Sequence, residues 1–480
     1  GMFHVKQSER RTALRRIGHN THTTRSCIGV ILICTALLLG SCGGIGQGDD
    51  PVGSNSAPED VSKTPPVTYD EMTAEEWLST LRNADYADYE FTIATSYSGR
   101  FTTVENTENE VEKARNKRNT LVENKYGIKI TEKSVRESEM INAILQSTAA
   151  GLQYADLVSA SMQTLSKLAA DGALTNLYSL PYYDGTADFC NASLHKGATA
   201  GHTCYAVFDD LTEAQEYTWC AFFNKAKTDA TALYRMAKSS TWTWDAFLAN
   251  ALNGGFAAYD TKNSLITTAF ATSGIEPVTG GYGNALSQNE NVEALDNIAS
   301  AVKTLINSQS YDSRRDDDAK KAFKNGEIAF LLAPLHLIDE LKDMSDDFGV
   351  LPLPSYDGNT RSVLDGDARG IAVPSDQTDS DRTGLILTAL TAASYQHIAE
   401  AKIQNHIYFD LRDNDSALSI RKIYDTQYIN LGILYSGGYS AIAASSQNAI
   451  IEAVTKDASF GKIFSREKTQ LETIANKYFR

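Results

Sequence analysis

Positive charge is scarce in this chain. Of its 480 residues, 44 are Lys or Arg and 60 are Asp or Glu, which gives a net charge of −16 at pH 7. Proteins that bind nucleic acid or dock on anionic lipid need clustered Lys and Arg. The acidic balance therefore argues against nucleic acid as a partner and favours neutral or cationic ligands over anions.

Motifs that carry enzymatic chemistry are also missing. The chain has no Gly-x-Ser-x-Gly elbow, no His-Glu-x-x-His zinc motif and no phosphate-binding Gly-x-x-x-x-Gly-Lys-Ser/Thr loop. Its cysteines match no zinc pattern. We therefore expect no enzyme activity, no metal and no cofactor. Paired carboxylates, Asp209-Asp210 or Asp365 with Asp367, keep a glycoside hydrolase as the less favoured alternative.

Long apolar runs are absent as well. The longest, Ile28–Leu39, has twelve residues, whereas a membrane-spanning helix needs about 20. This run follows an Arg-rich start and ends at small residues, which is the pattern of a secretory signal. Leu39-Gly40-Ser41-Cys42 resembles the lipobox of bacterial lipoproteins, which implies cleavage before Cys42 and lipid on that residue. We expect the mature protein to be extracytoplasmic and anchored to the bacterial cell membrane by lipid.

The segment after Cys42 is rich in Gly, Ser, Asp and Pro and predicts a flexible tether over 42–68. Removing residues 1–41 leaves 38 basic and 59 acidic residues, so the net charge falls to about −21. Roughly 400 residues remain, which is too many for one core and suits two domains.

Three cysteines remain in this body: Cys190, Cys204 and Cys220. Outside the cytoplasm, a disulfide between Cys190 and Cys204 is one arrangement, and three small buried thiols are the other. The sequence does not choose between them.

Strands and helices alternate along the body. Phe91–Thr95, Ile128–Ile130 and Asp156–Val158 read as strands, and each is followed by a helical pattern that ends at a glycine. The rhythm resumes with a helix face from Val292 to Ile306, and later strands begin near Ile328, Phe348 and Ile371. This alternation predicts an α/β fold with largely parallel sheets.

Several segments, taken in order over residues 90–375, resemble the family-1 extracellular solute-binding proteins of ABC importers. The strongest match is Phe323-Lys324-Asn325-Gly326-Glu327-Ile328-Ala329-Phe330, which resembles the family's F-x-x-G-(K/E)-x-A pattern. The others are Asp171–Leu177, Phe222–Lys225, Thr243–Phe247, Phe348–Pro354 and Gly370–Val373. The chain departs from the family near Val207, where a proline is missing, and in the Cys/His-bearing stretch 190–204.

The resemblance implies the periplasmic-binding-protein type II fold, in which hinge strands join two α/β lobes around a ligand cleft. Carried over onto this sequence, lobe one holds 86–207 plus 328–368, and lobe two holds 208–327 plus 369–480. It further implies a saccharide solute, ABC permease subunits as partners and a monomer. A glycan-binding or sensor lipoprotein is the alternative, because the same fold would serve it.

Ligands of open α/β sheets bind beyond the carboxyl ends of the strands. The loops at these ends contain aromatic side chains, which could stack on a sugar ring, and polar side chains, which could bond its hydroxyls. The family resemblance implies such a ligand. Trp244 lies in a family motif and is expected in the core. The candidate ligand-binding residues are Tyr97, Ser161, Asp209, Trp219, Tyr282, His336, Asp367, Arg369 and Tyr435.

Overall fold

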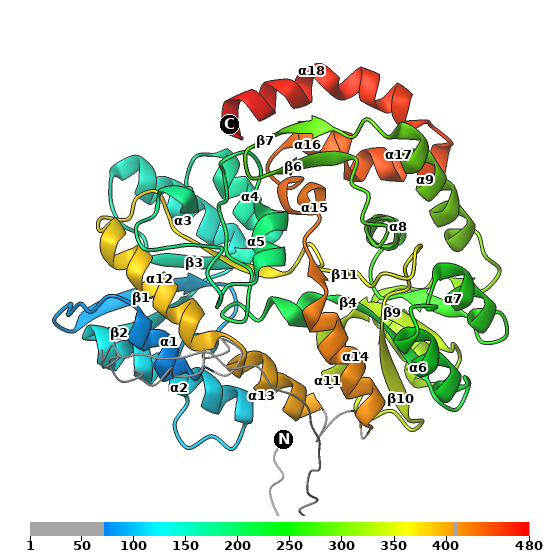
Figure 1. Cartoon of the computed structure of the whole chain (residues 1–480), viewed down its shortest axis with the longest axis horizontal. Coiled ribbons are helices and arrows are strands. Elements are labelled where there is room, and N and C mark those ends of the chain that lie inside the picture. The colour runs from blue at the N-terminus through cyan, green and yellow to red at the C-terminus, as the bar shows by residue number, and fades with distance from the viewer. Residues whose placement is uncertain (1–71, 407–410, 412, 480) are drawn as a thin grey trace, which may run out of the picture. The chain divides into compact units, whose positions relative to one another are not determined.

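Two β-sheets organise the chain in the computed structural model, which describes residues 72–406, 411 and 413–479 (Figure 1). The predicted signal peptide, the predicted lipidation site Cys42 and the predicted tether lie outside these residues. Elements around the first sheet and elements around the second lie on opposite sides of the view in Figure 1. We call these two regions lobe one and lobe two.

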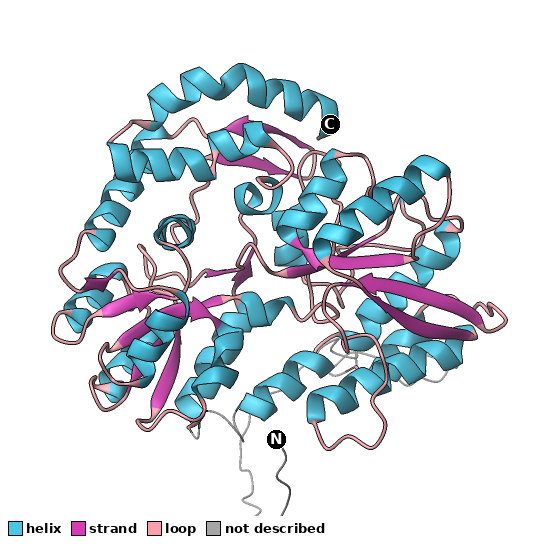
Figure 2. Cartoon of the chain, turned by 180° about the vertical axis from the view of Figure 1, so that it is seen from behind, coloured by secondary structure: helices cyan, strands magenta, loops and turns pink. Residues whose placement is uncertain are grey.

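Lobe one is built on a four-stranded sheet with the order β12-β3-β1-β2. β1, β2 and β3 run parallel, and β12 runs antiparallel to β3. Helices cover the sheet, as Figure 2 shows. The strands are β1 (Tyr89–Thr95), β2 (Ile128–Ser134), β3 (Leu157–Ser161) and β12 (Arg369–Ala372); the helices are α1 (Ala74–Thr80), α2 (Glu110–Tyr126), α3 (Glu137–Ala150), α4 (Met162–Ala170), α5 (Ala192–Ala198), α12 (Ser380–Ser394) and α13 (His397–Asn405).

Local sequence explains why these elements begin and end where they do. The Asn109 side chain accepts the N–H groups of Val111 and Glu112 and so caps α2. At the other end Gly127 has φ 57°, a left-handed conformation that costs glycine little. A Cβ at Gly127 would also meet the Asp85 carboxylate, which would have to move.

Lobe two is built on a five-stranded sheet with the order β10-β4-β9-β5-β8. β5, β8 and β9 are parallel, whereas β4 runs antiparallel to both β9 and β10. The strands are β4 (Trp219–Asn224), β5 (Phe256–Ala258), β8 (Tyr311–Asp312), β9 (Phe330–Pro334) and β10 (Phe348–Pro352); the helices are α6 (Ala230–Lys238), α7 (Trp244–Ala251), α8 (Lys262–Ala271), α9 (Val292–Ile306), α10 (Asp316–Lys324), α11 (Ile338–Leu341) and α14 (Asn414–Asp425).

The remaining elements lie between or beside these sheets. β11 (Ser362–Val363) pairs with β13 (Gln427–Tyr428), and β6 (Val278–Gly281) forms a hairpin with β7 (Asn284–Gln288). The chain ends in α15 (Leu431–Tyr435), α16 (Ser440–Ser445), α17 (Gln447–Lys456) and α18 (Phe460–Tyr478). Short 3₁₀ turns lie at η2 (Leu177–Ser179), η3 (Ala214–Tyr217) and η4 (Leu335–Leu337).

The fold class is as predicted, but the predicted lobe boundaries are wrong in two places. β9 and β10 lie in the second sheet, bonded to β4, although 328–368 was assigned to lobe one. β12 pairs with β3 in the first sheet, although 369–480 was assigned to lobe two. The chain therefore crosses back between β10 and β12. An apolar strand buried on both faces satisfies either sheet, so its pattern does not reveal which sheet it joins.

The cysteines adopt the second of the two predicted arrangements. Cys190, Cys204 and Cys220 are all buried and carry free thiols. Burial raises the pKa of the Cys204 thiol to about 11, which keeps it protonated at neutral pH. Trp244 is buried as predicted, and its indole N–H donates to the Thr272 hydroxyl at 2.9 Å.

Candidate ligand site

The carboxyl ends of the strands in both sheets lead into the segments that cross between the lobes. In lobe one, β3 ends at Ser161, opposite Arg369 at the start of β12. In lobe two, β9 ends at Pro334, opposite Trp219 at the start of β4. The crossing segments also touch one another, through a bridge between Thr218 and Leu364. Polar groups from both lobes therefore converge here, as expected for an open α/β fold.

A pocket of about 150 Å³ lies at this convergence and is lined by both lobes. We call it the interlobe pocket. Lobe one contributes Gln163 at the start of α4, and lobe two contributes Asp260, Asn263 and Ser264 around the start of α8. The rest of the lining comes from α8, the crossing segment and the last helices: Thr267, Thr268, Leu364, Asp365, Gly366, Asp367, Ile433, Gln447 and Ile451.

The side chain of Asp365, in the segment that crosses between the lobes, is held by two hydrogen bonds. The Trp219 indole N–H donates to Asp365 Oδ2 at 2.7 Å, and the Asp367 amide donates to Asp365 Oδ1 at 2.7 Å. Burial, helped by the negative charge of Asp367, raises the pKa of Asp365 to about 6. Asp365 is thus structural, whereas the exposed Asp367 is available to a ligand.

Stacked rings and guanidinium groups lie beside the pocket, on the lobe-one side. The Arg100 and Arg369 guanidinium carbons lie 4.6 and 5.2 Å from the centre of the Tyr97 ring. The Tyr97 ring meets Tyr217 edge to face at 6.4 Å, and Tyr217 lies 5.3 Å from the His336 ring. The 39% exposed Tyr97 is the member of this stack that presents a ring to solvent.

Glu137, which the sequence analysis missed, holds this stack to the first sheet. Its carboxylate accepts the Ser161 amide at 3.0 Å and the Ser161 hydroxyl at 2.7 Å, and it pairs with Arg369 at 2.9 Å. Burial opposes the charge, but hydrogen bonds from Thr164 and Ser161 and the charge of Arg369 outweigh it and lower the pKa of Glu137. Glu137 opens a helix after β2, where an acidic residue gives no functional signal.

Buried charges occupy the crossing turn η3. Glu213 pairs with Arg100, with Arg115 at 2.5 Å and with Lys402 at 2.9 Å. Glu216 accepts the Tyr424 hydroxyl at 3.0 Å. Burial opposes ionisation of both carboxylates, but the neighbouring cations hold their pKa values well below the ordinary range. The crossing is thereby fixed to both α2 and α13.

Five of the predicted ligand residues surround the convergence. Tyr97, His336, Asp367 and Arg369 lie on it, and their contact with a ligand stays a prediction. Burial lowers the pKa of His336, so its ring is neutral at pH 7 and bonds the Glu216 carbonyl at 3.3 Å. Ser161 is also there, but its hydroxyl caps α4 and binds Glu137, so direct ligand contact was wrongly predicted for it.

Three other predictions of ligand contact are wrong because the side chains are packed inside the protein. Trp219 is fully buried with its N–H on Asp365. Tyr435 is buried against Tyr439 and Phe479, and its hydroxyl donates to the Ala198 carbonyl at 2.7 Å. Asp209 is buried within its own loop, where it accepts the Leu211 amide.

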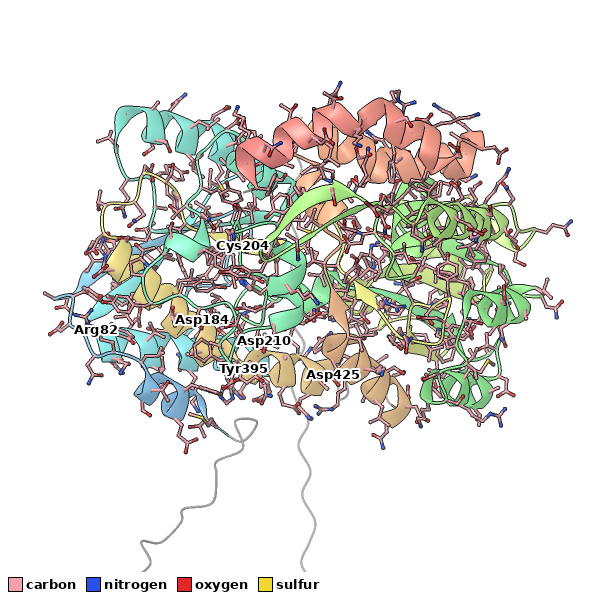
Figure 3. All side chains as sticks on the ribbon, turned by 45° about the horizontal axis from the view of Figure 1, so that its top comes forward. Arg82, Asp184, Cys204, Asp210, Tyr395 and Asp425 are labelled. Atoms are coloured by element: carbon pink, nitrogen blue, oxygen red, sulfur yellow. The ribbon has the colours of Figure 1, made fainter. Side chains whose placement is uncertain are left out.

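The paired carboxylates Asp209 and Asp210 also fail to form a hydrolytic pair in the interlobe pocket. Asp210 Oδ2 accepts the Gln396 amide at 2.7 Å, at the turn after α12, and Figure 3 labels Asp210 beside Tyr395 of that turn. Tyr282 lies elsewhere, against Tyr178 and His202.

Residues that line the pocket without having been predicted include Gln163, Asp260 and Asn263. Asp260 follows β5 at a distance of two residues, so a strand prediction at 256–258 would have found it. β5 has three residues and lies behind two glycines, which makes its pattern too short to recognise.

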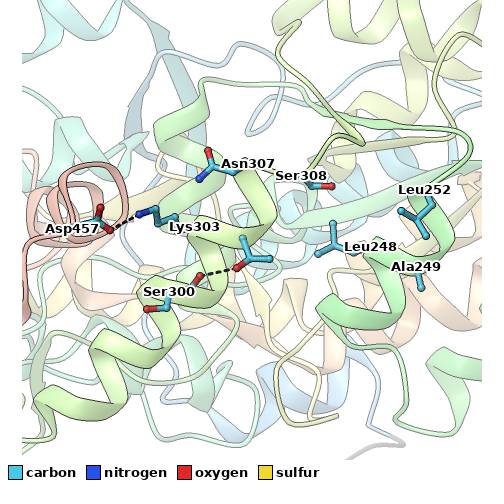
Figure 4. A pocket seen from close by; sticks show the side chains of 9 residues that line it. Leu248, Ala249, Leu252, Ser300, Lys303, Asn307, Ser308 and Asp457 are labelled. Atoms are coloured by element: carbon cyan, nitrogen blue, oxygen red, sulfur yellow. Dashed lines mark hydrogen bonds and ion pairs between the residues drawn. The ribbon is translucent and has the colours of Figure 1, made fainter.

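A larger hollow of about 660 Å³ lies on lobe two, between α7 and α9 (Figure 4). Leu248 and the 70% exposed Leu252 form its apolar side, and Lys303 pairs with Asp457 across it. The first sheet and its helices contribute nothing to this lining. The interlobe pocket, by contrast, is lined by both lobes.

Two absences concern the described part of the chain. Over residues 72–406, 411 and 413–479, three or more His, Cys, Asp or Glu side chains do not cluster in a way that would hold a metal ion. Over the same residues, the helices are too short or too polar to cross a membrane.

Comparisons with known proteins agree with this architecture. The chain resembles a cyclic α-maltosyl-1,6-maltose binding protein from Arthrobacter globiformis, with a TM-score of 0.53 at 14% identity over 81% of this chain and 99% of that one. It also resembles a cyclo/maltodextrin-binding protein complexed with maltotetraose, with a TM-score of 0.52 at 14% identity over 82% and 98%. Among curated proteins none matches.

Residues 120–403 match the model of one protein family, described as bacterial extracellular solute-binding protein. The match spans more than half of the chain and includes β3, the crossing turn η3, most of lobe two and the return to β12. The predicted resemblance is thus confirmed, and the chain belongs to the bacterial extracellular solute-binding protein family.

Proposed function

We propose that the chain is the substrate-binding protein of an ABC importer and captures a saccharide in the interlobe pocket. The observation that carries this proposal is the lining of one pocket by polar groups from both lobes: Gln163 from one, Asp260 and Asn263 from the other, and Asp367 from the crossing between them. Amide and carboxylate groups bond sugar hydroxyls, and the exposed Tyr97 ring nearby offers a face for the sugar's C–H surface. Proteins of similar fold bind oligosaccharides.

Binding between the lobes gives the ligand a mechanical effect. A ligand that contacts both lobes stabilises the closed arrangement by more than the open one, so binding shifts the population towards closure. The crossing segments would bend while each sheet moves as a rigid unit. The closed, loaded form would then dock on the permease, with lipid on Cys42 holding the protein, as a monomer, at the membrane.

We also propose that the protein binds the sugar without cleaving it. Both carboxylate oxygens of Asp365, a candidate for hydrolytic chemistry, already accept hydrogen bonds, from the Trp219 indole and from the Asp367 amide. We therefore expect bound sugar to be released unchanged.

A thermal-shift screen of the full chain against mono- and oligosaccharides, amino acids and short peptides tests the proposal. A ligand at about 100 times its dissociation constant adds about 2.7 kcal/mol to native-state stability, which is a readable shift. We expect a saccharide to give this shift and to be recovered intact by chromatography. Stabilisation by peptides or amino acids alone would contradict the saccharide claim, and cleavage of the sugar would contradict the binding role.

A further inference from the structure

A second, larger groove lies between α5 and the β6–β7 hairpin and has a volume of about 510 Å³. It and the interlobe pocket are lined by separate sets of residues. Beside apolar surface, the lining includes hydroxyl and amide side chains: Ser193, Thr199, Thr279, Asn289 and Asn291. Such groups bond a hydroxyl-rich ligand without requiring charge on it.

Two exposed tyrosines, Tyr178 and Tyr282, neighbour lining residues of this groove, and we call this pair its rim. The Tyr178 hydroxyl lies 3.2 Å from the hydroxyl of Thr199, a lining residue, and Tyr282 directly follows Gly281, another lining residue. The two rings have centres 5.1 Å apart and planes inclined by 45°. Their exposed fractions are 40% for Tyr178 and 62% for Tyr282, so aromatic surface faces solvent beside polar groups. This combination fits the alternating C–H and hydroxyl surfaces of a sugar.

The rim is also rigid. Tyr178 bonds His195 Nε2 at 3.1 Å, and burial lowers the pKa of His195, so this ring is neutral at pH 7. The His202 ring meets Tyr282 edge to face at 4.9 Å. The hairpin is bonded to the loop before Cys204, because Gly283 N donates to Gly201 O at 2.8 Å and Gly201 N donates to Asn284 O at 3.0 Å. Rings that are already ordered lose little entropy on binding.

The charge of the groove points to a neutral ligand. Glu276 receives the Tyr428 hydroxyl, and burial raises the pKa of its carboxyl to about 7, so it carries only part of a negative charge at neutral pH. Lys196 stands exposed at the edge. Near the rim, Asp184 is engaged by the amide and hydroxyl of Thr186 at 2.8 and 2.7 Å. A groove so close to neutrality, in a chain of net charge −16, neither attracts polyanions nor needs a cation.

We propose that this groove and its Tyr178–Tyr282 rim bind a neutral glycan chain at a site separate from the interlobe pocket. The site would hold the protein on a polysaccharide while the interlobe pocket binds the transported solute. It does not depend on what that solute is.

Native affinity electrophoresis of the full chain tests this site. Gels contain one neutral polysaccharide each, namely amylopectin, galactomannan, arabinoxylan or a mixed-linkage β-glucan, with the anionic alginate as a charge control. We expect at least one neutral polysaccharide to retard the protein. The double variant Tyr178→Ala/Tyr282→Ala should weaken that retardation by at least about tenfold, because stacking surface is lost from both rings.

Three more variants distinguish binding at this rim from binding at another surface and from loss of the fold. Tyr182→Ala removes a tyrosine of similar exposure, 41%, whose ring contacts Arg82 outside the groove. This variant should migrate like the parent protein. Tyr97→Ala alters the interlobe site and should leave retardation unchanged. Tyr282→Ala alone controls for loss of the fold, because the Tyr282 ring is mostly exposed to solvent. This single variant should weaken retardation while its melting temperature stays that of the parent.

Several outcomes would overturn the proposal: migration unaffected by every neutral polysaccharide, equal retardation by alginate, equal retardation of the Tyr178/Tyr282 variant, or retardation abolished by Tyr97→Ala. Failure here leaves the thermal-shift result with small saccharides untouched. Conversely, retardation that persists without any thermal shift would support this site and remove the proposed transport function.

Discussion

Buried carboxylates fall into two classes in this protein, and the neighbouring charges decide which. Glu213 has three cations around it and stays ionised, whereas Asp209 has Asp210 beside it and a pKa raised to about 7. Sequence shows only a run of acidic residues from 209 to 216. The partners come from α2, the loop after β1 and α13, which are about 100 to 190 residues away. Long-range pairing of this kind leaves no local pattern.

Glu213→Gln should destabilise the fold strongly. The change leaves Arg100, Arg115 and Lys402 around a neutral side chain, and breaking a buried ion pair costs about 3–5 kcal/mol. Urea unfolding followed by circular dichroism measures the loss. Glu75→Gln is the matched control: its pair with Lys117 is about half exposed, so a change below about 1 kcal/mol is expected. Equal effects of the two substitutions would contradict the assigned role of the η3 charges.

Asp209→Asn should change how the stability of the fold depends on pH. The ordinary pKa of Asp is about 3.9, and burial with the charge of Asp210 raises it to about 7 in the folded protein. The stability that this group contributes is therefore fully present below about pH 4 and is lost as the pH rises through about 7. Asparagine still accepts the Leu211 amide but does not ionise.

Urea midpoints of the parent and Asp209→Asn at pH 5 and pH 7.5 measure this effect. We expect the variant to gain stability relative to the parent at pH 7.5 compared with pH 5. A difference between the two proteins that is the same at both pH values would show that Asp209 does not titrate in this window.

Sequence patterns located residues at the interlobe convergence where a strand end was recognised, and they failed to show which aromatic side chains are packed inside. Tyr97 and Arg369 lie next to strands that the sequence revealed. Trp219 and Tyr435 have the residue types of a sugar site, but their polar atoms are bonded within the protein. Composition of a loop cannot show which of its aromatic rings turn inward.

At the scale of elements, local patterns predicted all four strands of the first sheet but only β9 and β10 of the second. The helical segment after β12 is divided into α12 and α13 at Gln396, which has φ 58°. What the patterns could not give was sheet membership, since β9 is buried on both faces and fits either sheet. Pairing with β4 decides it, and that information lies in contacts more than 100 residues apart.

Gly384 shows how a helix depends on its neighbours. It lies within α12, where a Cβ would come 1.9 Å from the Pro181 carbonyl oxygen. Gly384→Ala should therefore destabilise the protein by about 1–3 kcal/mol, as overpacking does. In α18, a Cβ at Gly461 would meet Val292 at an ordinary 3.7 Å.

Gly461→Ala should accordingly stabilise the chain, by up to about 1 kcal/mol, through helix propensity alone. Differential scanning calorimetry should show a lower melting temperature for Gly384→Ala and a higher one for Gly461→Ala if α12 packs against the segment before α5 as described. Shifts of the same direction would contradict it.

At the scale of the whole molecule, the two lobes have separate cores but share the last helix. Phe460, Ile463 and Phe464 of α18 pack in the core of lobe two, whereas Leu471 and Ala475 pack in the core of lobe one. Movement of one lobe against the other must therefore bend or slide α18 as well as the crossing segments. Family membership is shown by the match to residues 120–403, and the interlobe pocket is where this movement would act on a ligand.

The most direct test of the account is isothermal titration of the full chain with the saccharide that the thermal-shift screen selects. Gln163→Ala and Asn263→Ala each remove a pocket group from a different lobe, and Tyr182→Ala serves as the surface control. We predict that each pocket variant weakens binding by about tenfold or more, which is about 1.4 kcal/mol, with an unchanged melting temperature of the unliganded protein. Unchanged affinity in both pocket variants would contradict the claim that the ligand binds between the lobes.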